Sequence, residues 1–404
     1  MKPALLLRIL EGAALLLLVY QLYTLGFRVL LPLLGNPNIL QTDFHYYYDA
    51  AVRFSQDRTR LYLATDHYIA GFAYPPLAIL PFLVLSHLPL GAALLIFTVA
   101  SYAALVAAVL LWCRYLREHG VPIDGATMRA IVLVSLALGP TYMNAIFGQV
   151  NAIVLLSCVA FLTLAATRPF PAGVLLACGM WLKVYPIVMV AVASWSRRRW
   201  KAIAIAGLAA MVLMVIALPI VPLSSHQAFV SNVLPARFDK TAIHVVNQSL
   251  VAFLERFQMP PVRYLQWTGE QAITVSQPVR ILNWGFAAAA LFFLWMRAKA
   301  GSAVSRVTSD AAVMALVAMV APLGWGHTYM LVVPLVILRL AGIGQSDLFR
   351  ALVVFCCVGA LMVPSGRLFA FTADWPAWLQ NLLYSRYLLA TGILAVLKIG
   401  PERR

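Results

Sequence analysis

Stretches without a charged side chain make up most of the chain. Four long ones are Leu88–Cys113, Ala130–Thr167, Ala202–Ser225 and Ala311–Leu338, which contain no Asp, Glu, Lys or Arg. A helix needs about 20 apolar residues to cross the hydrocarbon core of a bilayer. The pattern therefore predicts an all-α polytopic membrane protein.

Twelve transmembrane helices fit this pattern best, within a range of eleven to thirteen. Their predicted positions are 9–33, 74–88, 89–112, 129–146, 149–167, 171–194, 201–223, 279–297, 308–323, 327–342, 350–368 and 384–399. The segment Tyr74–Leu88 could instead be re-entrant or interfacial. The break at Lys183–Pro186 could likewise divide its span into a short hairpin. We predict one membrane domain over residues 1–404.

Two long polar loops, at about 34–72 and 224–278, interrupt the apolar pattern without a marked basic excess. Basic residues gather instead at the ends of spans, as in the run Arg197–Lys201. Cytoplasmic loops carry the excess of Lys and Arg, so both termini are predicted to be cytoplasmic and both long loops to face the other side. We expect the protein to be a multi-pass protein of the cell (inner) membrane. Within the first loop, Phe44–Phe54 is predicted to form an amphipathic interfacial helix.

Composition narrows the class of partner. The chain is 63% hydrophobic and 11% charged, with a formal net charge of +16. Because the basic residues lie at span ends, membrane lipids rather than nucleic acid are their expected partners. No phosphate loop, zinc motif or nucleotide-binding glycine fingerprint occurs in the sequence. We therefore expect no cofactor and no metal site.

Three titratable residues stand out against this apolar background. Asp43 follows the first span among aromatic residues and could act as a general base, or simply begin an interfacial helix. Lys183 interrupts an apolar stretch, where a charge costs about 2.5–3.5 kcal/mol. It should therefore meet an anion such as a lipid phosphate, unless its amine reaches the surface. His327 follows a helix break and could serve a phosphate or a sugar, or be structural.

Neutral amide side chains form two further clusters. One contains Gln149 and Asn151 between two spans, and the other contains Asn247 and Gln248 in the second long loop. Carboxamides suit sugar hydroxyls because each offers two donors and an acceptor. They suit helix packing and turns equally well.

Taken together, these segments resemble a known family in their order and spacing. The matching pieces are Asp43-Phe44-x-x-Tyr47-Tyr48-x-Ala50-Ala51, Leu61-Tyr62, Phe72-Ala73-Tyr74-Pro75-Pro76-Leu77, Gly148-Gln149-Val150-Asn151, Ala172-Gly173, Lys183-x-x-Pro186, Asn247-Gln248-Ser249-Leu250 and Trp325-x-His327. The chain resembles glycosyltransferase family 87, which includes α-1,2-mannosyltransferases that use polyprenyl-phosphate mannose. The resemblance implies the C-type membrane glycosyltransferase fold.

The resemblance also implies roles for individual residues. Asp43 would deprotonate the acceptor hydroxyl, while Lys183 and His327 would hold the leaving lipid phosphate. The remaining expected cavity residues are Asp49, Tyr74, Gln149, Asn151, Asn247 and Gln248. One segment departs from the family pattern of Trp-Asp-His-His, because this chain has Trp325-Gly326-His327-Thr328. The departure leaves the donor and the acceptor open.

The implied reaction is transfer of a hexosyl residue, with mannose expected, from a polyprenyl-phosphate sugar to a lipid-linked or glycan acceptor. It would occur on the non-cytoplasmic face, in the periplasm or at the cell exterior, by inverting direct displacement. A transporter or flippase of a lipid-linked or small solute is the alternative, because intramembrane charges and broken helices also mark transport paths. A scaffold subunit with an altered site is a third interpretation.

Overall fold

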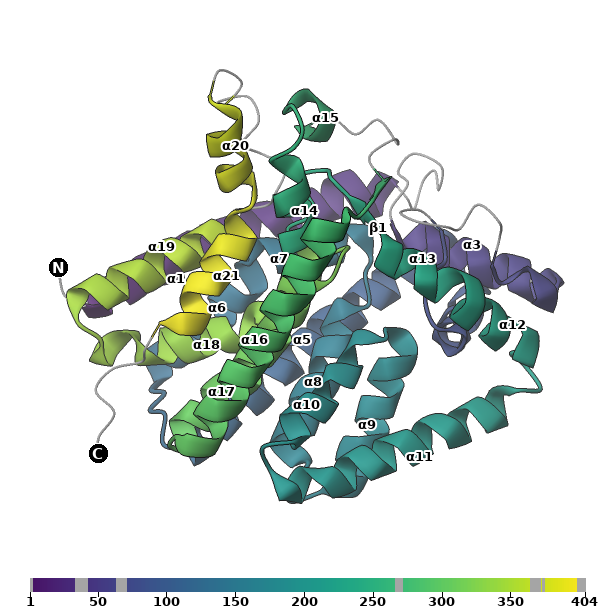
Figure 1. Ribbon diagram of the computed structural model, residues 1–404, viewed down its shortest axis with the longest axis horizontal. Helices are drawn as coiled ribbons and strands as arrows, with labels where there is room; N and C mark the ends of the chain where they lie inside the picture. Colours follow the sequence, from purple (N-terminus) through teal and green to yellow (C-terminus); the bar gives the residue numbers. More distant parts are fainter. Residues whose placement is uncertain are drawn as a thin grey trace. The chain divides into compact units, whose positions relative to one another are not determined.

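A computed structural model of the protein describes residues 3–32, 43–62, 71–265, 272–363, 372 and 375–397. Helices dominate this part of the chain (Figure 1). The sheet that it contains has two short strands, β1 (Lys240–Ala242) and β2 (Ala272–Thr274). The prediction of an all-α protein is confirmed.

The chain divides into two compact units, each built from separated segments. Unit 1 comprises Met1–Gln21, Val109–Met143 and Thr241–Arg404, and unit 2 comprises Leu22–Ala108 and Asn144–Lys240. The single domain over residues 1–404 stays a prediction.

Unit 2 contains short helices between a few long ones. Its elements are the end of α1 (Pro3–Leu25), the π-helical turn η1 (Gly26–Leu30), α3 (Asp43–Gln56), η2 (Arg58–Arg60), η3 (Pro76–Ala78), α4 (Ile79–Leu85), most of α5 (Leu90–Glu118), the end of α7 (Gly139–Phe147), α8 (Asn151–Leu164), α9 (Pro169–Leu182), η4 (Tyr185–Val188), α10 (Met189–Ala193), η5 (Arg197–Arg199), α11 (Trp200–Ala217), α12 (Leu223–Ala228), η6 (Phe229–Val233) and α13 (Leu234–Asp239).

Glycines allow the central helices of unit 2 to pack closely. Helix α9 lies against both α8 and α11 (Figure 1). A Cβ added at Gly173 of α9 would lie 2.6 Å from the backbone oxygen of Ala202 in α11. One added at Gly179 would collide with the hydroxyl of Ser157 in α8. Small residues at such crossings let backbones approach, which is a common basis of helix association in membranes.

Unit 1 contains the longer paired helices. Its elements are α6 (Gly125–Ala137), the start of α7, α14 (Leu250–Arg256), α15 (Val262–Leu265), α16 (Gln277–Ala300), α17 (Ala303–Val320), η7 (Gly326–Val332), α18 (Val333–Gly342), η8 (Ile343–Gln345), α19 (Leu348–Met362), α20 (Ala377–Tyr384) and α21 (Arg386–Val396), together with the sheet and the first part of α1.

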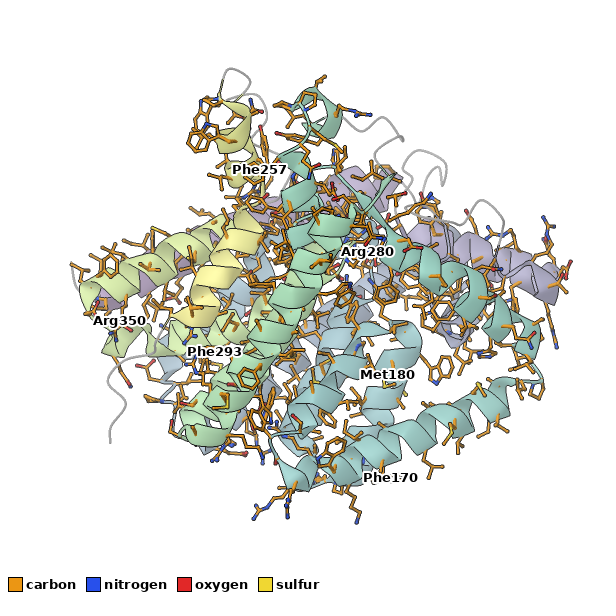
Figure 2. The ribbon with its side chains drawn as sticks, viewed as in Figure 1. Phe170, Met180, Phe257, Arg280, Phe293 and Arg350 are labelled. Carbon is orange, nitrogen blue, oxygen red and sulfur yellow. The ribbon has the colours of Figure 1, made fainter. Side chains whose placement is uncertain are left out.

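Helices α16 and α17 form a hairpin (Figure 1). Arg297 and Lys299 lie in the last turn of α16, where cations complement the helix dipole. Ser302 then begins α17, because its hydroxyl accepts a hydrogen bond from the backbone N–H of Ser305. Phe292 and Phe293 on α16 are 64% and 58% exposed, and Figure 2 labels the second of them. Such exposed apolar side chains suit contact with lipid.

Among the described residues, six helical segments are long and apolar enough to cross a membrane. They are Pro3–Leu25, Leu90–Glu118, Arg197–Ala217, Gln277–Ala300, Ala303–Val320 and Gly326–Gln345. Helices α6 and α7 pass the same test together, with a bend of 45° between them. The protein is therefore a helical membrane protein.

Several predicted spans correspond to shorter helices. The predicted span 74–88 contains one apolar helical segment, Pro76–Leu85, whose length is about 15 Å. It is thus shorter than the roughly 30 Å hydrocarbon core.

The predicted break in span 171–194 is present: α9 ends at Leu182, and Lys183 is extended, with φ −150° and ψ 143°.

Candidate active site

Helix α3 begins at Asp43, and its apolar face anchors that end of the helix. The buried residues of α3 are Phe44, Tyr47, Ala50, Ala51 and Phe54, at helical spacing. The ring of Tyr47 stacks on Phe82 of α4 with centroids 4.4 Å apart. Phe44 contacts the same ring at 6.0 Å. The predicted amphipathic helix is therefore present, and its packing fixes the position of Asp43.

A tight turn between α7 and α8 carries Gln149 and leads to Asn151, the first residue of α8. Gly148 in this turn has φ +64°, a conformation that favours glycine. A Cβ at Gly148 would lie 2.6 Å from Cβ of Phe44, so the turn and α3 are in close contact. This contact brings the carboxamide of Gln149 beside Asp43, although more than 100 residues separate the two in sequence.

The helix break after α9 places Lys183 in the same cluster. Its ammonium donates to Oδ1 of Asn151 at 2.9 Å and to Oε1 of Gln149 at 3.2 Å. The Nζ atom also lies 5.4 Å from the ring centroid of Tyr74 and 5.6 Å from that of Tyr185. Aromatic faces attract a cation at such distances. Lys183 is thus held by neutral groups rather than by a carboxylate.

Gln149 connects the groups of this cluster. Its amide nitrogen donates to Oδ2 of Asp43 at 2.8 Å. Its carbonyl oxygen accepts from Tyr47 at 3.1 Å, Tyr74 at 3.3 Å and Lys183 at 3.2 Å. Three donors thus converge on one oxygen, which has two lone pairs.

The electrostatic setting of Asp43 combines opposing effects. Burial raises the pKa of its carboxyl above the ordinary value. The hydrogen bond from Gln149 and the positive charges of Lys183 and Arg237 lower it in part. A carboxylate with a raised pKa is a stronger base, which suits removal of a proton from a hydroxyl.

The cluster thus combines a half-buried carboxylate with a nearby cation in a helical membrane protein. A sequence profile of glycosyltransferase family 87 matches residues 72–323, well over half of the chain. The chain belongs to glycosyltransferase family 87. It is therefore a glycosyltransferase. No curated protein sequence and no solved structure matches it significantly.

The glycosyltransferase holds five of its predicted site residues together in unit 2. They are Asp43, Tyr74, Gln149, Asn151 and Lys183. Asp49 is exposed on α3 and lies outside the cluster. The physical reason is helical geometry, because six residues turn a helix by about 240° relative to Asp43.

Asn247 and Gln248 lie in unit 1, where both are fully buried at 0% exposure. The amide nitrogen of Asn247 donates to the backbone oxygens of Ala242 and Pro322. Gln248 donates to the backbone oxygen of Val245 and accepts from the backbone N–H of Tyr387 at 3.1 Å. Their polar atoms are thus engaged within the fold.

His327 is also buried in unit 1, near the start of η7. The preceding segment pairs with the Asn247 loop, since Gly326 donates its backbone N–H to Val246 and Gln248 donates its own to Gly324. Tyr329 donates its hydroxyl to the backbone oxygen of Gln248 at 2.6 Å. The two sequence motifs therefore support one another structurally.

Three residues of the unit 2 cluster were not predicted as site residues. Tyr47 carried a detectable signal, because it stands four residues after Asp43 and thus on the same helix face. Tyr185 follows the helix break by two residues and contacts Asn151 through its hydroxyl. Arg237 lies on α13, distant in sequence, and the sequence gives no sign that its charge acts on Asp43.

Metal ligands are not grouped in the described part of the chain. No three His, Cys, Asp or Glu side chains within it lie close enough together to hold a metal ion.

Proposed function

We propose that this glycosyltransferase moves a hexosyl residue, with mannose as the expected sugar, from a polyprenyl-phosphate sugar to a hydroxyl of a lipid-linked or glycan acceptor. The observation that carries the proposal is the joint attachment of Asp43 and Lys183 to Gln149. A base and a cation beside each other are what this transfer needs.

The chemistry is a single displacement. Oδ1 of Asp43 takes the proton of the acceptor hydroxyl while the oxygen of that hydroxyl attacks the anomeric carbon. The bond from the anomeric carbon to the phosphate oxygen breaks, and its electron pair stays on the lipid phosphate. Lys183 stabilises the negative charge of this leaving group. One displacement inverts the anomeric configuration.

The wider setting belongs to the same proposal. We infer a C-type fold with about twelve spans, both termini in the cytoplasm and the site on the outer face of the cell membrane. The distribution of basic residues supports this orientation. The resemblance of the sequence around Trp325 is the support for a role of His327 in phosphate binding.

An assay with purified protein tests the proposal. Polyprenyl-phosphate mannose, glucose and arabinose are supplied in turn with a lipid acceptor, and release of polyprenyl phosphate is measured. We expect release with one donor, and a fall of about 10³-fold for Asp43→Asn, because that variant lacks the base. Full activity of Asp43→Asn would remove Asp43 from the mechanism. Solute flux in liposomes without sugar transfer would favour transport.

A further inference from the structure

Asp43 and Lys183 share a neighbour without pairing directly. Among the described residues, ion pairs within 4.0 Å join Arg114 to Glu118, Arg129 to Glu11 and Arg350 to Asp347, and none joins Asp43 to Lys183. Each of the two is instead bonded to the Gln149 carboxamide, the acid through the amide nitrogen and the amine through the oxygen. The carboxamide therefore occupies the place that a direct ion pair would take.

We propose that Gln149 is a positioning residue that keeps the general base and the phosphate-binding cation apart, so that each stays available to its own substrate. This inference rests on the roles proposed above for Asp43 and Lys183. It adds a requirement to them: the two opposite charges must be close together and yet remain unpaired.

The physical need for such a spacer follows from the strength of a partly buried ion pair. A cation within about 4–6 Å lowers the pKa of a carboxyl by about 1–3 units, which makes the carboxylate a weaker base. Pairing would also occupy the ammonium that the phosphate requires. A neutral amide that bonds to both groups prevents their direct contact, so that Lys183 lowers the pKa of Asp43 only in part and its ammonium stays available to the phosphate.

The orientation of Gln149 is fixed by its surroundings. Tyr47, Tyr74 and Lys183 all donate to its oxygen, and Asp43 only accepts. A flipped amide would direct N–H groups at the Lys183 ammonium, which can only donate, and its oxygen at the Asp43 carboxylate, which can only accept. The bonding pattern therefore holds the amide nitrogen toward Asp43.

Other charged and titratable groups also face Asp43. They are Tyr47 on the same helix, Tyr74 before η3, Lys183 after α9 and Arg237 on α13. None of these changes in the variants below, so differences between the variants arise at residue 149.

Two substitutions separate spacing from hydrogen bonding. Gln149→Met keeps nearly the same volume but removes the bond that stabilises the carboxylate. Its acid limb in the profile of kcat/KM against pH should therefore move to higher pH. Gln149→Ala removes the spacer, so Lys183 can pair with Asp43. Its acid limb should move to lower pH by about 1 unit, with a lower rate at neutral pH. General damage to the fold would not shift the two limbs in opposite directions.

Binding of polyprenyl phosphate gives a second readout that needs no turnover. We expect Gln149→Ala to weaken this binding about ten-fold, because Asp43 then occupies the ammonium. Gln149→Met should stay within about three-fold of the wild type. The double variant Gln149→Ala with Asp43→Asn should recover affinity, since its residue 43 no longer carries a charge.

Failure of this inference is distinguishable from failure of the proposed function. Equal affinity of Gln149→Ala and wild type for polyprenyl phosphate, or limbs that move in the same direction, would overturn the spacer role even when Asp43→Asn is inactive. Turnover that survives Asp43→Asn would instead overturn the base. If Gln149→Ala does not fold, an acid limb of Gln149→Met that fails to rise overturns the inference.

Discussion

Arg256 of α14 in unit 1 is a buried cation, at 1% exposure. Its guanidinium donates to the side chains of Asn381 and Ser385 and to three backbone oxygens in the segment that precedes Gln248. Burial lowers its pKa to about 10, so it remains charged at neutral pH. One side chain thus fixes the loop, α14 and the end of α20 together.

Arg256→Met should therefore lower the thermal stability of the purified protein. The substitution leaves several buried acceptors without a donor, and we expect a loss of about 3 kcal/mol. The measurement is the unfolding midpoint in detergent. Arg263→Met is the matched control, because Arg263 is exposed on α15 and should leave the midpoint unchanged. Equal midpoints for the two variants would contradict the assignment.

Individual site residues could be predicted to the extent that they were physically conspicuous. Asp43 and Lys183 stood out because a charge in apolar surroundings needs a compensating partner. The fully bonded amide of Asn247 could not be inferred, because a carboxamide suits a sugar and a packed turn equally well. Arg237 could not be inferred either, since only the folded chain brings its charge near Asp43.

The turn between α7 and α8 is the element on which the site depends most directly. Gly148→Ala adds a left-handed backbone penalty of about 1–2 kcal/mol and places a methyl group against Phe44 and Leu94. We expect a lower unfolding midpoint together with a fall of about 10²-fold in kcat/KM, because α3 must move and Asp43 moves with it.

Gly120→Ala is the control for this prediction. Gly120 also has a positive φ, of 82°, but a Cβ there would meet nothing within 4 Å. It should therefore show the backbone penalty and keep its activity. Loss of activity in both variants to the same degree would show that strain alone, rather than the contact with α3, is responsible.

The crossing of α8 and α9 offers a second prediction at the scale of the element. Gly179→Ala should push α9 away from Ser157. The backbone oxygen of Gly179 accepts a hydrogen bond from the backbone N–H of Lys183, so Lys183 should move with α9 and its distance to Asn151 should increase. We expect binding of polyprenyl phosphate to weaken about ten-fold.

The control for α9 lies on the neighbouring helix α11. A Cβ at Gly207 would meet nothing within 4 Å, so Gly207→Ala should leave binding unchanged. Weaker binding in the control, or unchanged binding in Gly179→Ala, would contradict the role of close packing here.

Among the elements, long helices were predictable and short ones were not. An uninterrupted apolar run predicts a helix such as α5, since a helix satisfies all of its backbone groups within one segment in a bilayer. The run at 129–146 instead forms α6 and α7, with a bend of 45° between them. This bend could not be predicted, because hydropathy indicates which segments are apolar and not the direction of the helix axis. The break at Lys183 was predictable because a charge and Pro186 both oppose a continuous helix there.

At the scale of the whole molecule, family membership and site placement rest on different parts of the chain. The family match covers residues 72–323 and includes Gln149 and Lys183. Asp43 and His327 lie outside that range. The placement of Asp43 therefore depends on the contacts of α3, which the match alone does not supply.

Orientation in the membrane is the property of the whole molecule that the proposed chemistry requires. The run Arg197, Arg198, Arg199 and Lys201 should be cytoplasmic, whereas α3 should face outward with the site. In a variant without the five native cysteines, Gln56→Cys at the exposed end of α3 should react with a membrane-impermeant maleimide in intact cells. Arg198→Cys, which is also exposed, should react only after lysis. If Arg198→Cys reacts in intact cells and Gln56→Cys does not, the outward-facing site is wrong. A donor sugar would then have to be presented from the cytoplasm.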